Sequence, residues 1–226
     1  MITKEELTKA LRHCEEADLE ENMVGAAILI NPDDTQHAAI FVRYNGDSKL
    51  FHFTGKSVII EDVSGTEDYY FKNLDFLPAV LLPAFMAQSE LILEKAQPEF
   101  GYFYDGSLYD SNGDFISPND APEYMTCVGF CLNVIKGFLS DEDFFQFDDW
   151  DERSMGGKME HVESFLLKVK ESYPEITLED FKANLRRIQP LEYVAGAFSK
   201  NIPVRKDFTD GIIENLQKSL NEKKVA

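Results

Sequence analysis

The stretch between residues 23 and 63 constrains the fold most, because short apolar segments alternate there with turn formers. The run Asn31-Pro32-Asp33-Asp34 ends the first segment, and Asn45-Gly46-Asp47 has the composition of a tight hairpin turn. Turns this short join neighbouring strands that run in opposite directions. The sequence therefore predicts an antiparallel meander whose strands cover residues 23–30, 36–44, 50–54 and 57–63.

Helical patterns surround and follow this meander. The capping-box pattern Thr3-Lys4-Glu5-Glu6 predicts a first helix that runs to about Glu20. Further helices are expected over residues 77–95, 127–139, 158–172, 178–188, 191–198 and 208–223. Strands early and helices late favour an α+β fold. We expect one domain over residues 1–156, with residues 157–226 forming a helical extension or cap packed on it.

Charge and composition exclude some classes of function. The 22 Lys and Arg residues are outnumbered by 41 Asp and Glu residues, which gives a net charge of −19. Such a surface repels nucleic-acid backbones and anionic membranes, so neither is an expected partner. No apolar run approaches the roughly 20 residues needed to span a bilayer. The oligomeric state is left open.

Cysteine use and the N-terminus favour a reducing compartment. The three cysteines, Cys14, Cys127 and Cys131, are too few for a disulfide framework. Residues 1–6 lack the basic and apolar regions of a secretory signal, so a cytoplasmic location is expected.

Cys127 is the strongest candidate for a nucleophile. It falls in the first turn of a helix that is apolar nearly all round, where unpaired backbone N–H groups and the helix dipole favour a thiolate. Gly129, two residues on, would let a ligand or another segment approach the helix closely. Cys131 lies one turn deeper in an apolar setting, which makes it the weaker candidate. A buried structural role for Cys127 is the alternative, because free cysteines are usually core residues.

Two histidines on neighbouring predicted strands can serve this thiol. If His37 and His52 share one face of the sheet, His37 can take the thiol proton while His52 orients it. His13 and His161 lie on predicted polar helix faces and are expected to be solvated. A metal is not expected. The alternation of Asp110, Asn112 and Asp114 resembles a calcium loop, but Phe115 stands where that loop needs glycine.

The residues around Cys127 and His37 resemble two motifs of the NlpC-type papain-like peptidases. Thr126-Cys127-Val128-Gly129-Phe130 is similar to their Asp-Cys-Ser-Gly-Phe nucleophile motif. The strand that begins at His37, the Asn45-Gly46 turn and His52 resemble their second motif. Here the histidines precede the cysteine, as in the circularly permuted branch that includes the YiiX-like and lecithin:retinol acyltransferase-like proteins. The similarity covers roughly residues 23–139.

The resemblance implies a permuted papain-like fold and a cysteine hydrolase, a peptidase or amidase, with a Cys127, His37, His52 triad. Cys127 would form a thioester acyl-enzyme with a small peptide, amide or acyl-ester substrate, without a cofactor. Two alternatives remain. One is a catalytically inactive binding or immunity-type module that retains the fold. The other is a thiol acyltransferase that passes the acyl group to a lipid or amide acceptor.

Overall fold

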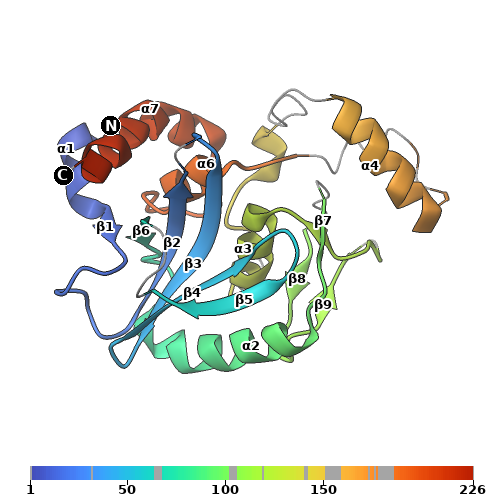
Figure 1. Cartoon of the computed structure of the whole chain (residues 1–226), viewed down its shortest axis with the longest axis horizontal. Helices are drawn as coiled ribbons and strands as arrows, with labels where there is room; N and C mark the ends of the chain where they lie inside the picture. Colours follow the sequence, from blue (N-terminus) through green and yellow to red (C-terminus); the bar gives the residue numbers. More distant parts are fainter. Residues whose placement is uncertain are drawn as a thin grey trace.

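The computed structural model describes residues 2–31, 33–63, 68–101, 106–118, 120–139, 142–150, 159–172, 174–175, 177 and 186–225. Its centre is a six-stranded antiparallel sheet in the order β1-β6-β2-β3-β4-β5. Helices pack around this sheet, so the fold is α+β, as the sequence predicts (Figure 1).

The predicted meander is confirmed by the structure. Its strands are β2 (Met23–Ile30), β3 (Gln36–Tyr44), β4 (Asp47–Phe53) and β5 (Val58–Asp62), each antiparallel to the next. The turn between β3 and β4 uses Asn45 and Gly46, whose φ angles are 52° and 86°. These positive angles explain the Asn-Gly pair, since both residues tolerate the left-handed region.

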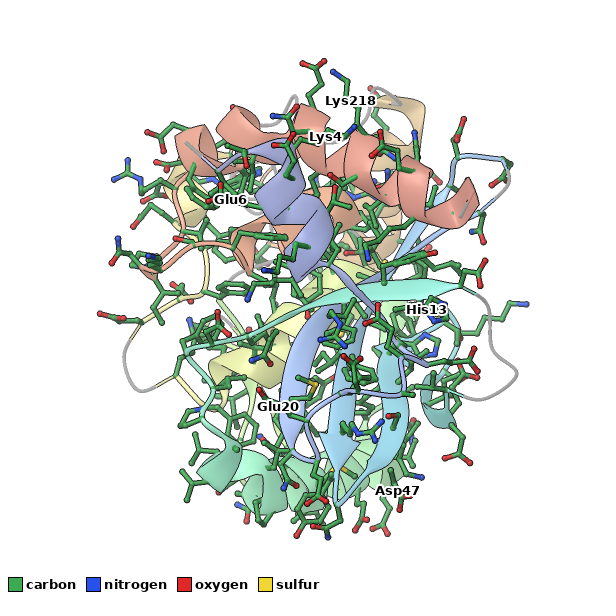
Figure 2. The ribbon with its side chains drawn as sticks, turned by 90° about the vertical axis from the view of Figure 1, so that its left-hand side faces the viewer. Lys4, Glu6, His13, Glu20, Asp47 and Lys218 are labelled. Carbon is green, nitrogen blue, oxygen red and sulfur yellow. The ribbon has the colours of Figure 1, made fainter. Side chains whose placement is uncertain are left out.

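Two strands of the sheet were missed by the sequence analysis. β6 (Tyr69–Asn73) pairs with the outer edge of β2, and β1 (Arg12–His13) pairs with β6. The first helix, α1 (Lys4–Ala10), is much shorter than predicted. Its capping box at Thr3 is present, but the chain turns extended at Leu11 and enters β1. The segment between His13 and Glu20 then crosses one face of the sheet (Figure 2).

The remaining large helices bury the other face. α3 (Cys127–Lys136) packs on β3 and β4, and α6 (Pro190–Gly196) packs on β2 and β3. α7 (Lys206–Val225) covers α6 and α1, where Thr8 Oγ1 donates to Ser219 Oγ at 2.9 Å. α2 (Leu82–Lys95) follows a short 3-10 turn, η1 (Ala79–Leu81), and has Pro83 in its first turn, where a proline costs no helical hydrogen bond.

Shorter elements lead into α3. β7 (Glu99–Phe100) pairs in parallel with β10 (Tyr124–Met125), directly before Cys127. β8 (Leu108–Tyr109) and β9 (Phe115–Ile116) form a hairpin.

After α3 the chain continues with η2 (Phe147–Asp149) and α4 (Met159–Ser172). Most of the helix predicted over 178–188 lies outside the described residues.

The sheet is buried on both faces, and the two faces belong to different apolar clusters. The helix face, which contacts α3 and α6, includes Ala26, Ile28, Ala38, Ile40 and Phe51. The loop face, under the segment around Leu19, includes Leu29, Ala39, Phe41, Leu50 and Phe71. Helices α6 and α7 contribute to the same cluster as α3, so the residues after 186 share the main core.

Within the described residues, no helix is both long enough and apolar enough to cross a membrane.

Candidate active site

Cys127 is the first residue of α3, as predicted. Thr126 is the N-cap and its side chain accepts a hydrogen bond from the Gly129 backbone N–H at 3.1 Å. The role predicted for Gly129 is not what the structure shows. A Cβ at Gly129 would meet Met125 at 3.3 Å and Thr126 at 3.6 Å, so the close neighbours belong to the cap segment itself.

His37 and His52 share the loop face of the sheet, where they form a direct pair. His37 Nε2 lies 2.7 Å from His52 Nδ1, and the two rings meet edge to face with centroids 4.9 Å apart. Both rings also lie within 6.5 Å of the Tyr69 ring, centroid to centroid. His52 is 5% exposed, so its ring nitrogens depend on protein partners.

Glu61, on β5, is a further candidate residue of this site, which the sequence did not predict. Its Oε1 lies 2.9 Å from His52 Nε2. A carboxylate only accepts hydrogen bonds, so His52 Nε2 carries the proton and neutral His52 must accept at Nδ1. His37 therefore donates from Nε2, which leaves a lone pair on its Nδ1. The chain Glu61–His52–His37 fixes the tautomer that a general base requires.

The thiol lies on the helix face, near the part of β3 that is not paired with β4. The pairing of β3 with β4 stops at Ile40 and Phe51, so residues 36–39 of β3 are paired with β2 but not with β4. The Ala38 backbone, at this unpaired edge, donates a hydrogen bond to the Cys127 thiol. Ala38 directly follows His37. The structure thus pairs the two predicted histidines on the loop face, while the thiol lies near Ala38 on the opposite, helix face of β3.

No hydrogen bond joins Cys127 Sγ to the His37 ring among the described residues. The parity of β3 explains this. His37 points with Ala39 and Phe41 toward the loop face, while Ala38 and Ile40 point toward α3. The thiol and the proposed base therefore lie on opposite faces of β3.

The expected thiolate is not supported by the electrostatics of the site. Burial raises the pKa of the Cys127 thiol, although the Ala38 backbone, the positive charge of Arg187 and the N–H groups at the start of α3 oppose that rise. Burial and the neighbouring His52 lower the pKa of His37 to about 4. Both groups are therefore neutral at pH 7, and the helix start does not outweigh desolvation.

Of the other cysteines and histidines, Cys131 is buried as expected, whereas His13 is half-buried rather than solvated. Cys14 and Cys131 are fully buried, and burial raises the pKa of each thiol well above its usual value. His13 is on β1 rather than on a helix, 3.6 Å from the Asp68 carboxylate. The side chain of His161 lies outside the described residues.

In the calcium-like loop, Lys95 contacts two of the residues that alternate in the sequence. Lys95 Nζ donates to the Asn112 carbonyl at 2.7 Å and to Asp114 at 2.9 Å, while Asp110 accepts from the backbone of its own loop. No group of metal-ligating side chains occurs among the residues that the structure describes.

A scan against protein-family models, a search of the curated proteins and a search of the solved structures each found no match for this chain. The function is therefore argued from the geometry of the site.

Proposed function

We propose that this chain is a cysteine hydrolase of the circularly permuted papain-like class, in which Cys127 is the nucleophile and His37 is the general base. The observation that carries the proposal is the hydrogen-bonded chain from Glu61 through His52 to His37. It ends beside Ala38, whose backbone contacts the thiol. In a catalytic triad, too, a third residue fixes the tautomer of the histidine that serves the nucleophile.

The reaction starts from a neutral pair. The thiol proton passes to His37 Nδ1 while sulfur bonds to the acyl carbon of an amide or ester. The departing amine or alcohol takes that proton, which leaves a thioester on Cys127. Water then attacks the thioester, His37 accepts its proton, and a carboxylic acid leaves as the thiol re-forms.

The start of α3 serves the oxyanion of each tetrahedral intermediate. The N–H groups of Cys127 and Val128 have no partner within the helix, and both act on the Cys127 sulfur. A carbonyl oxygen bound to that sulfur develops negative charge within reach of the same groups.

Trapping of the acyl-enzyme tests the proposal. The protein is incubated with p-nitrophenyl acetate and its intact mass is measured before and after neutral hydroxylamine, which cleaves thioesters. A 1:1 acetyl adduct that is lost in Cys127→Ala and kept in Cys14→Ala supports the nucleophile. His37→Gln is expected to slow acetylation about 100-fold, the lower end of general-base contributions, while His13→Gln leaves it unchanged.

A folded wild-type protein that is never acylated at Cys127 would overturn the proposal. That result would favour the second candidate, an inactive binding module. The raised pKa of Cys127 and the missing hydrogen bond to His37 are the observations that support this second candidate. An acyltransferase differs only in the acceptor, and turnover with added amines or alcohols separates it from a hydrolase.

A further inference from the structure

A cavity of about 510 Å³ lies between the start of β3 and the helices α6 and α7. Its apolar wall is formed by Pro190 and Leu191 at the start of α6 and by Ile213 of α7. Polar groups enter it from Gln36 at the start of β3, from Arg187 and from Asp34. Ligand sites of small molecules have this size and this combination of apolar wall and few polar groups.

Two observations connect the cavity to Cys127. Gln36 lies two positions from Ala38 on β3, so both point to the same face of the sheet, and the Ala38 backbone contacts the thiol. Arg187 lines the cavity and its positive charge also lowers the pKa of Cys127. Arg187 thus both lines the cavity and acts on the sulfur through its charge.

The chemistry of the lining selects a type of ligand. Arginine recognises a carboxylate with two parallel hydrogen bonds, and a half-buried guanidinium is less screened than one in water. The apolar wall suits a short hydrocarbon chain. Asp34 is the one carboxylate among the lining residues, and its charge disfavours a ligand that carries a second negative charge near it.

We propose that this cavity binds the acyl group of a substrate that ends in a carboxylate, and that Arg187 recognises that carboxylate. Acyl transfer to Cys127 rests on the proposed function, whereas binding of the carboxylate in the cavity does not. The acyl group is assigned to the cavity because it stays bonded to Cys127 throughout the thioester stage and needs an enclosed site.

This assignment gives the C-terminal helices a role. Arg187, Leu191 and Ile213 all lie after residue 157, outside the part of the chain that resembles the papain-like class. These residues supply the wall and the charge of the cavity, while the strand and the thiol come from the earlier part of the chain.

Paired esters test the substrate class. The rate of Cys127 acylation is measured with mono-p-nitrophenyl adipate and with p-nitrophenyl hexanoate, which has the same chain length without the carboxylate. Adipate is used because shorter half-esters hydrolyse through an internal anhydride. We expect the adipate ester to react about tenfold faster than the hexanoate, the effect of one charge-assisted contact.

The variants assign that preference to Arg187. Arg187→Gln is expected to bring the ratio of the two rates close to one by slowing only the adipate ester, and Arg187→Lys is expected to retain part of the preference. Arg186→Gln is the matched control, because Arg186 is the neighbouring arginine, forms an ion pair with Asp148 and is not among the residues that line the cavity. Equal rates for the two esters in the wild type would overturn the inference and leave the proposed hydrolase intact.

A binding measurement separates the two proposals. Free adipate is titrated into Cys127→Ala by calorimetry, alone and combined with Arg187→Gln. Binding that depends on Arg187 supports the cavity assignment even if neither ester acylates the wild type, in which case only the proposed function fails. Absence of adipate binding to Cys127→Ala, or binding that Arg187→Gln leaves unchanged, overturns the inference.

Discussion

Replacing Glu61 by glutamine tests whether the buried hydrogen-bonded chain controls the base. During acylation His37 becomes positively charged, and Glu61 faces it across the His52 ring. The two bonds of 2.7 Å and 2.9 Å place these charges roughly 8 Å apart, and Coulomb's law at an effective dielectric of about 20 gives roughly 2 kcal/mol. The Glu61 side chain is 38% exposed, so solvent screening lowers this to about 1 kcal/mol.

Glu61→Gln should therefore slow acylation of Cys127 about fivefold, with little change in stability. A larger loss is expected if the amide turns its NH₂ group toward His52, because that group would impose the wrong tautomer on both rings. The assay is the single-turnover rate of acetylation, followed by intact mass.

Asp62→Asn is the matched control. Asp62 is the next residue of β5, and its carboxylate lies 3.2 Å from Lys49 Nζ rather than near the histidines. Both variants remove one negative charge from the same strand, so only a positional effect distinguishes them. Equal acylation rates in wild type and Glu61→Gln, or an equal loss in Asp62→Asn, would refute the role of the chain.

Three further outcomes follow from the site. Because the pKa of His37 is lowered to about 4, the rate of acylation should be constant from pH 5 to 8 and fall below pH 4, where the base is protonated. A pH profile of the single-turnover rate with its midpoint near 6.5 would contradict this. Because burial raises the pKa of Cys127, iodoacetamide should react with Cys127 more slowly than with the thiol of free glutathione at pH 7, as peptide mass mapping would show. Faster labelling of Cys127 would indicate that it rests as a thiolate. Thr126→Ala removes the N-cap of α3 and should lower the free energy of unfolding by about 1 kcal/mol in urea, whereas Thr126→Ser should lower it less.

The sequence predicted the sheet well where its signals were local. Apolar runs bounded by Asn31-Pro32 and Asn45-Gly46 placed β2 and β3 at their observed bounds. The pairing of β6 with β2 depends on contacts between distant segments, which no local pattern encodes. The early end of α1 at Ala10 was also unpredictable, since tertiary pairing of β1 with β6 overrides the helical pattern that follows.

The sequence predicted where Cys127, His37 and His52 lie in the secondary structure, but neither the contact of Glu61 with His52 nor the electrostatics of the site. The hairpin turn brought His37 and His52 together, and the N-cap placed Cys127 at a helix start. Which face His37 occupies was not readable, because β3 is apolar on both faces and alternation carries no signal there. Whether the pKa of Cys127 is raised or lowered depends on how deeply the start of α3 is buried, which only the packed structure reveals.

The contact between α1 and α7 has a consequence for how the chain matures. Thr8 and Ser219 are separated by 211 positions, so the first helix has to wait for almost the whole chain to be synthesised before its partner leaves the ribosome. Until then the apolar side of α1 around Leu7 is uncovered.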